Sequence, residues 1–184
     1  AQDEGSVQVE QVMSRTQTHI PVTTLLYRFT YRRVRATDVV VSPGLIPLFS
    51  LPVRVGLPSL TFIRDHRDDP IETHRGSFNT FDTGVASGVF GSEAAFGRFN
   101  GQNSTYYQFH LKRWVFARNT RLGVAAPFAD THQLPLPERF FAGGASSHRG
   151  FAINQAGPRD LTTGQPLGGN AVFVNNLELR TPPI

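Results

Sequence analysis

The sequence contains no cysteine, which excludes a disulfide scaffold and a metal site built on thiolates. It also has no run of apolar residues close to the ~20 that a membrane-spanning helix needs. A membrane-spanning β-barrel stays possible, because its strands alternate between two faces and its mean hydropathy remains low. The mean hydropathy of −0.23 is compatible with a membrane protein of this one type.

Lysine is almost absent: Lys112 stands alone beside seventeen arginines, and the net charge is +4. A basic chain can bind nucleic acid, but these arginines are dispersed through strand-like segments rather than clustered. Arginines that line a polar barrel lumen account for the same charge better, so we expect no nucleic-acid partner. Residues 1–4 have neither a basic start nor an apolar core. No signal peptide is visible there, and we expect an internal fragment.

Strict alternation of apolar and polar residues is clearest over residues 22–35, where Leu25, Tyr27, Phe29 and Tyr31 share one face. This run exceeds the ~5–6 residues of an ordinary strand and approaches the ~9–11 that cross a bilayer at a tilt. Seven candidate strands follow from such patterns: 6–17, 22–35, 53–62, 76–90, 98–109, 114–127 and 170–180.

Two details of these strands are less regular. Pro58 interrupts the alternation of residues 53–62 and predicts a bulge. The pattern of residues 114–127 does not settle which side chains share a face. Aromatic residues near the turn at 110–113 suit a girdle at a membrane interface, and the alternative is the packed core of a soluble barrel. These aromatics are Tyr106, Tyr107, Phe109 and Trp114.

An acidic turn at residues 64–76 has two interpretations. Asp65, Asp68 and Asp69 could bind calcium, and His66 and His74 could bind a transition metal. The spacing fits neither an EF-hand nor a zinc site. We therefore favour a solvated turn whose acids pair with the neighbouring arginines, and we expect no metal.

The longest connection covers residues 128–169 and has neither a helical nor a strand period. Loops of this length are functional or disordered, and the glycines and aromatics of this one argue against disorder. Gly143 and Gly144 allow backbone conformations that are closed to other residues. Arg149 precedes Gly150, so its planar guanidinium can lie close to backbone and bind a carboxylate through two hydrogen bonds.

The loop contains, in order, Pro-Glu-Arg-Phe-Phe-Ala-Gly-Gly, Arg-Gly-Phe, Gly-Pro-Arg-Asp and Leu-Gly-Gly-Asn-Ala. This series resembles the long loop of the BamA/TamA superfamily of outer-membrane proteins. The family loop usually has Val or Leu before Arg-Gly-Phe, and His148 departs from it there. The turn at 64–76, Arg-Asp-x-Arg-Asp-x-Pro followed by Arg-Gly, resembles a second element of the same superfamily.

The resemblance implies an all-β fold, an antiparallel transmembrane β-barrel. Residues 1–184 would be an incomplete portion of it, with about seven strands and one inward-folding loop. POTRA domains and the first and last barrel strands are expected outside this sequence. The implied function is to insert or fold outer-membrane proteins, or to translocate proteins, in the bacterial outer membrane. The implied partners are the lipid bilayer, nascent outer-membrane or secreted proteins, and periplasmic or lipoprotein accessory subunits.

The resemblance also implies that the loop enters the lumen, with Arg149 buried as its anchoring cation. The acid that pairs with this arginine is expected beyond Ile184, and Glu178 is an available substitute within the chain. The residues that the resemblance marks as the functional loop are Arg139, Gly143, Gly144, Arg149, Gly150 and Phe151.

No catalytic arrangement is visible. Ser146 and Ser147 lie near His148, but adjacent loop residues rarely aim at one another, and no acid is spaced for a triad. The Gly-Gly pairs lack the strand-to-helix setting of a phosphate loop, so we expect neither an enzyme nor a cofactor. Two alternatives remain open: a passive outer-membrane porin and, less favoured, a soluble β-barrel binding protein.

Overall fold

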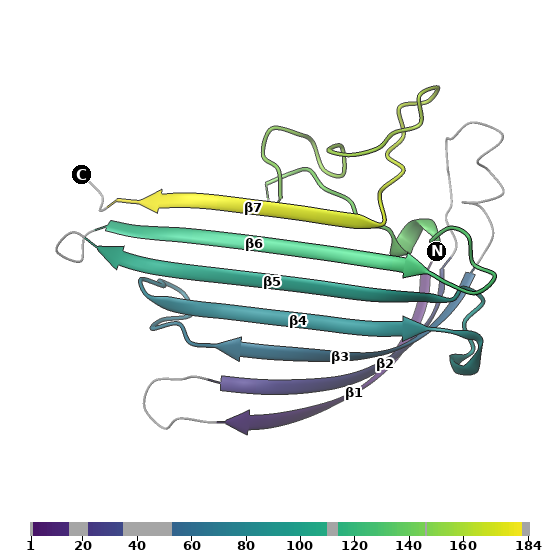
Figure 1. Ribbon diagram of the computed structural model, residues 1–184, viewed down its shortest axis with the longest axis horizontal. Coiled ribbons are helices and arrows are strands. Elements are labelled where there is room, and N and C mark those ends of the chain that lie inside the picture. Colours follow the sequence, from purple (N-terminus) through teal and green to yellow (C-terminus); the bar gives the residue numbers. More distant parts are fainter. Residues whose placement is uncertain (1, 15–21, 35–52, 110–113, 146, 182–184) are drawn as a thin grey trace.

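The computed structural model describes residues 2–14, 22–34, 53–109, 114–145 and 147–181. They form one seven-stranded antiparallel sheet, in which each strand pairs with its neighbours in the sequence (Figure 1). The all-β antiparallel fold expected from the sequence is confirmed. The strands are β1 (Gln2–Ser14), β2 (Val22–Val34), β3 (Val53–Asp65), β4 (Gly76–Ala86), β5 (Phe96–Phe109), β6 (Trp114–Pro127) and β7 (Ala171–Arg180).

A predicted bulge and several strand ends differ from the expectation. Strand β1 begins and ends earlier than 6–17, β3 extends to Asp65 instead of 62, and β5 begins at Phe96 instead of 98. Pro58 causes no bulge, because β2 and β3 pair in unbroken register through Phe29 and Pro58. Pro58 lies just beyond the last β3–β4 pair, Ser59 with Gly84, where a missing N–H removes no bond to β4. Strand β4 ends at Ala86 rather than at residue 90, because a short 3-10 helix, η2 (Gly88–Phe90), replaces its last residues.

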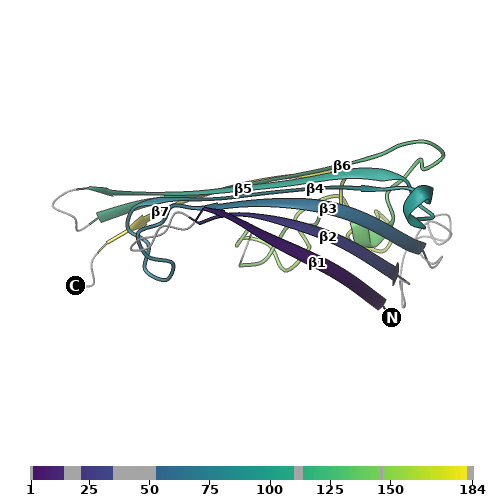
Figure 2. The same ribbon diagram turned by 90° about the horizontal axis from the view of Figure 1, so that it is seen from below.

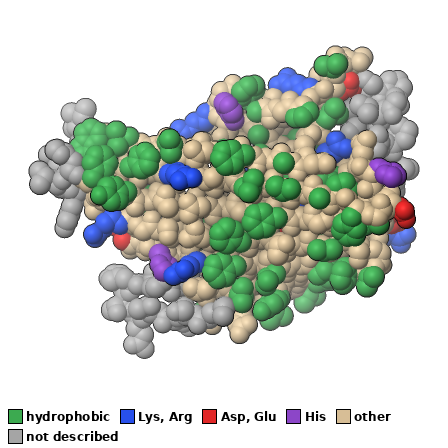
Figure 3. All heavy atoms as spheres, in the orientation of Figure 1, with side chains coloured by type: hydrophobic (Ala, Val, Ile, Leu, Met, Phe, Trp, Pro, Cys, Tyr) green, Lys and Arg blue, Asp and Glu red, His purple; other side chains and the backbone are tan. Residues whose placement is uncertain are grey.

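The sheet is curved, and the long loop lies on its concave side (Figure 2). We call the concave side the inner face and the convex side the outer face. The outer face carries large apolar side chains in alternate positions, and few charges interrupt them (Figure 3). Exposed examples are Tyr27, Phe29, Tyr31, Leu60, Phe81, Phe99, Tyr107, Phe109, Phe116, Leu122, Val124, Phe173, Leu177 and Leu179. A face of this kind suits hydrocarbon rather than water.

The aromatics near the 110–113 turn divide between the two faces. Tyr107, Phe109 and Trp114 form a continuous outer cluster, with ring centroids 6.4 and 6.5 Å apart. Tyr106 is on the inner face, where the guanidinium of Arg180 lies 5.5 Å from its ring centroid. The predicted girdle is therefore wrong for Tyr106, since the period of two places neighbouring residues on opposite faces.

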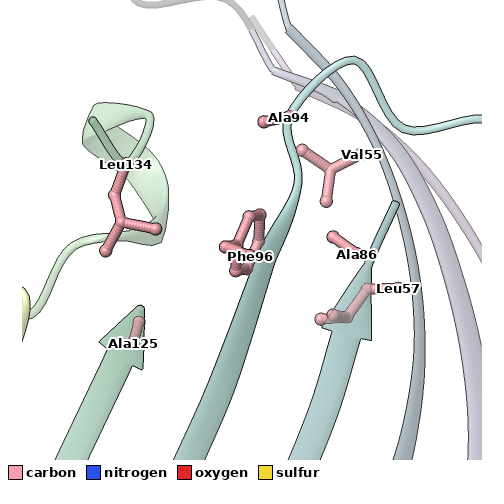
Figure 4. Packing of buried hydrophobic residues seen from close by; sticks show 7 residues of the cluster. All are labelled: Val55, Leu57, Ala86, Ala94, Phe96, Ala125 and Leu134. Atoms are coloured by element: carbon pink, nitrogen blue, oxygen red, sulfur yellow. The ribbon is translucent and has the colours of Figure 1, made fainter. Parts of the chain in front are cut away.

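Most of the few buried apolar residues gather at one end of the inner face, where the long loop meets the sheet. Phe96 and Leu134 are almost fully buried in this cluster, against Val55 and Ala125 (Figure 4). Leu134 belongs to the long loop, so the cluster fixes the start of that loop onto the strands. Among the described residues, no helix has both the length and the apolar character to cross a membrane.

Candidate functional site

The long loop occupies residues 128–170 and begins with a rigid turn. Pro135 and Pro137 flank the start of a 3-10 helix, η3 (Leu136–Glu138), and restrict its backbone. Arg139 then ties the two ends of the loop together. Its Nε donates to the Leu134 carbonyl at 3.0 Å, and its Nη1 donates to the Leu167 carbonyl at 3.1 Å.

Glu138 is the buried charge that holds this turn to the sheet. Its side chain is 0% exposed and accepts hydrogen bonds from Arg32 on β2 and from Arg98 on β5, the latter at 3.4 Å. Arg98 also lies 3.8 Å from Asp82, whose carboxylate accepts a 2.7 Å hydrogen bond from Thr61. Four strands of the inner wall therefore contribute to a network with the loop carboxylate at its centre. A buried carboxylate needs such partners, because an unpaired one is strongly unfavourable.

Aromatic packing continues the attachment beyond Glu138. Phe140 lies over Gly123 of β6, where an added Cβ would come within 2.6 Å of the ring. Phe140 also exchanges two backbone hydrogen bonds with Gly169, at 2.8 and 2.9 Å. A glycine on β6 thus makes the space in which the loop aromatic can lie against the wall.

Gly143 and Gly144 both adopt backbone conformations that are closed to most other residues. Gly143 has φ 122° and Gly144 has φ 87°, both in the region that favours glycine. The Ser147 hydroxyl donates to the Gly143 carbonyl at 2.9 Å and accepts from its N–H at 2.8 Å. The ring of His148 stands edge-on to Phe151, with centroids 4.8 Å apart.

Arg149 lies on the inner side of β7 but is not buried: its side chain is 77% exposed. Its Nη2 donates to Glu178 at 3.0 Å. Glu178 also lies 3.6 Å from Arg180. The predicted burial of Arg149 is therefore not observed, while the carboxylate considered as its substitute partner does contact it. The buried anchor of the loop is Glu138 instead.

Sequence reasoning missed Glu138 although the residue lies inside the recognised motif. The charged residues predicted for the functional loop were the neighbouring Arg139 and Arg149, because arginine is the usual bidentate partner of carboxylates. One signal in the sequence could have found it: Glu138 follows Pro135 and Pro137 in a chain whose strands are rich in arginine. An acid in such a restricted turn needs cationic partners if it is buried.

A cavity of about 390 Å³ opens beside the Glu138 network, between the loop and strands β4 to β6. Most side chains on its sheet side are polar, including Asp82, Arg98, Gln102 and Arg121. In the described part of the chain, no group of three His, Asp or Glu residues is placed to hold a metal ion. The cavity is a polar, charged space rather than an apolar ligand pocket.

The acidic turn between β3 and β4 uses its carboxylates to fix its own backbone. Asp68 Oδ1 accepts hydrogen bonds from the N–H groups of His74 and Arg75, both at 3.0 Å. Asp69 Oδ1 accepts from two further N–H groups, at 2.7 and 3.0 Å. Asp65 pairs with Arg67 at 2.6 Å. The predicted pairing with arginine therefore holds for Asp65 alone, and Asp68 and Asp69 bond to backbone N–H groups instead.

We expect this turn to lose order in acid. The N–H groups of Glu72 and Ile71 lower the pKa of Asp69. Burial opposes ionisation of Asp68, but backbone N–H groups outweigh it and its pKa is also lowered. A lowered folded pKa contributes stability that is present above the ordinary carboxyl pKa of about 3.9 and is lost as the pH falls below it. Protection factors of the His74 and Arg75 amides should therefore drop between about pH 6 and about pH 3.

The matched variant is Asp68→Asn, which keeps an acceptor oxygen but removes the charge. Protection of the same two amides should then vary little across this pH range. An equally steep fall in the variant would show that Asp68 is not the group that titrates.

Comparison with known proteins gives one family and two relatives. A family model described as the Omp85 superfamily domain matches residues 57–184. The chain is similar to the sorting and assembly machinery component 50 homolog of Bos taurus, at 29% identity over 124 residues, which cover 67% of this chain and 25% of that protein. The Mus musculus homolog of the same name is 35% identical over 68 residues. These residues cover 37% of this chain and 14% of that protein.

Among solved structures, the chain resembles the crystal structure of BamA from Haemophilus ducreyi lacking POTRA domains 1–3. The TM-score is 0.76 at 18% sequence identity, and the match covers 99% of this chain and 37% of that one. The likeness shows a common fold. The chain spans about a quarter of the length of the bovine relative.

Proposed function

Because this chain belongs to the Omp85 superfamily, we propose that it serves as an outer-membrane β-barrel wall that assembles or translocates other proteins. The observation that carries the proposal is the long loop, which is fixed to the inner wall through buried Glu138 and reaches β7 through Arg149. A protein that guides other chains needs a loop held in a defined position beside its wall.

The physical need for such a protein is clear. Unpaired backbone groups in hydrocarbon are costly, so a strand that enters a membrane must be paired as it inserts. The partners that we propose are the bilayer itself, nascent outer-membrane or secreted proteins, and accessory subunits of the periplasm or of the lipoprotein type. We propose no catalytic step: Ser147 is bonded to Gly143, and His148 packs against Phe151.

The proposed location is an outer membrane. The relatives come from Bos taurus and Mus musculus, and the similar structure comes from Haemophilus ducreyi, so these comparisons do not favour a bacterial cell over a eukaryotic one. Separation of outer and inner membranes from the source cell, followed by detection of the protein, tests the location directly.

Arg149→Ala in the full-length protein is the test of function. The Arg149–Glu178 pair is largely exposed, so it contributes at most about 1 kcal/mol to stability, and the fold should persist. Assembly of outer-membrane proteins should nevertheless fall when this variant is the only copy in the cell. The measurement is the amount of folded client barrels, read from their heat-modifiable migration on gels. Arg159→Ala is the matched control, because Arg159 is an exposed arginine of the same loop that bonds to Gln155.

Depletion of the protein distinguishes the rival function. Loss of client barrels on depletion supports assembly or translocation. Normal client levels, together with the loss of a membrane conductance, would identify a passive porin and contradict the proposal.

A further inference from the structure

A row of polar side chains crosses the outer face among the apolar residues. Asn79, Asn103, Thr120 and Asn175 stand side by side on β4, β5, β6 and β7, as the pairing register shows. Arg118 joins the row, and these five residues are called the outer polar band. Each lies on the outer face, because each is two residues from an outward apolar or aromatic residue such as Phe81, Gly101, Phe116, Leu122 or Phe173.

The side chains of the band form two hydrogen-bonded groups, Asn79 with Asn103 and Arg118 with Thr120 and Asn175. Asn103 Nδ2 donates to Asn79 Oδ1 at 2.6 Å. Thr120 Oγ1 donates to Asn175 Oδ1 at 2.8 Å. Arg118 Nε donates to Thr120 at 3.0 Å and to Asn175 at 3.3 Å. The band is therefore an organised polar surface rather than a set of isolated polar residues.

Apolar residues lie on both sides of the band along the same strand. On β6, Trp114 and Phe116 precede it, and Leu122 and Val124 follow it. The ten residue-to-residue steps from Trp114 to Val124 rise ~33 Å along the strand. At a barrel tilt of ~40° this is ~25 Å of height, which equals the apolar band of an outer-membrane barrel. Arg118 and Thr120 therefore lie within the hydrocarbon layer, where polar groups facing lipid are costly.

Arg118 is not placed to reach lipid headgroups. An arginine that snorkels points toward the nearer interface, which the aromatic cluster of Trp114 marks here. Arg118 instead directs its Nε to Thr120 and Asn175, one row deeper. Within the described residues, its two Nη groups have no hydrogen-bond partner. An anionic oxygen at the same depth in the membrane would complement them.

Among the outward side chains that the structure describes on β1 to β7, none is an aspartate or glutamate, so none of them supplies that oxygen. The described outward side chains of a second copy would therefore bring another arginine and further amides to the band, but no carboxylate. A different membrane-spanning chain can carry an acidic side chain at this depth. Pairing with Arg118 would lower the free-energy cost of burying that acid in the membrane.

We propose that the outer polar band is the docking surface for a different membrane-spanning protein, whose lipid-facing segment carries an Asp or Glu near the middle of the bilayer. Amide or hydroxyl side chains next to that acid would bond to the Asn and Thr residues of the band. The proposal rests on the membrane placement of the outer face and not on the assembly activity.

The test places a photo-crosslinking residue at Thr120 of the full-length protein in its native membrane. Val124, four residues away on the same outward row of β6, is the matched control position. We expect one adduct of defined size from position 120 and none from 124. Mass spectrometry should identify a membrane protein whose crosslinked peptide contains Asp or Glu, and Arg118→Leu should abolish the adduct. Adducts with lipid only, with a second copy, or equally from both positions would overturn the proposal.

A second measurement separates docking from folding. The full-length Arg118→Leu protein is refolded in phosphatidylcholine vesicles, without any partner. Removal of an arginine from the lipid face should raise the urea midpoint of unfolding. A lowered midpoint would show that Arg118 serves the fold of this chain, and would contradict a docking role.

Discussion

Replacing Glu138 with alanine is expected to lower the free energy of unfolding by about 3–5 kcal/mol and to release the long loop from the inner wall. The substitution leaves Arg32 and Arg98 partly buried, with side chains only 16% and 22% exposed and without their shared carboxylate. The urea midpoint of the refolded full-length protein measures the first effect. Proteolysis within residues 128–170 measures the second.

Two variants make this prediction specific. Glu72→Ala removes an acid whose side chain is 84% exposed, and it should change neither measurement. Adding Arg98→Met to Glu138→Ala should cost less than the sum of the two single changes, because the carboxylate they share is already gone. Equal behaviour of Glu138→Ala and Glu72→Ala would show that another contact holds the loop.

Gly143→Ala is the substitution with the second-largest expected effect. At φ 122° an alanine is strained by ~1–3 kcal/mol. The new Cβ would also lie 2.2 Å from the Ala152 carbonyl oxygen, which belongs to backbone and must move. We expect a total loss above about 2 kcal/mol, with disordering of the turn that presents Arg149. Hydrogen exchange of the Gly144 and Phe151 amides is the measurement.

Gly164→Ala is the control for strain alone. Gly164 has φ 72°, and nothing lies within 4 Å of its Cβ position. Its replacement should cost only the about 1–2 kcal/mol of a left-handed alanine and leave the exchange near Gly144 unchanged. If Gly143→Ala and Gly164→Ala behave alike, then the contact with Ala152 does not matter.

The strands were predictable because a period of two is a local property of the sequence. Each strand was found, although several ends were misplaced, and Leu25, Tyr27 and Phe29 share one face as their alternation indicates. The superfamily was also recognisable, because its loop motif is continuous in sequence, and the family match confirms it. The bulge at Pro58 was wrong, since pairing with β2 is decided by the neighbouring strand and not by the proline alone.

The role of Glu138 could not be predicted from a local sequence pattern. Its partners Arg32 and Arg98 are 106 and 40 residues away, and only the register of the sheet brings them together. The outer polar band could not be predicted from the sequence for the same reason. Asn79 and Asn175 lie on strands at opposite sides of the band, and each one alone resembles an ordinary polar residue at a strand position.

Two of the ionic contacts that fasten the loop to the wall differ in their exposure to water. The contact near its root, at Glu138, is sealed from water, whereas the contact nearer its tip, Arg149 with Glu178, is open to water and to salt. Raised ionic strength should therefore free the tip while the root stays in place. The two contacts therefore have a fixed order of release as salt is added: Arg149 with Glu178 first, and Glu138 with its arginines later.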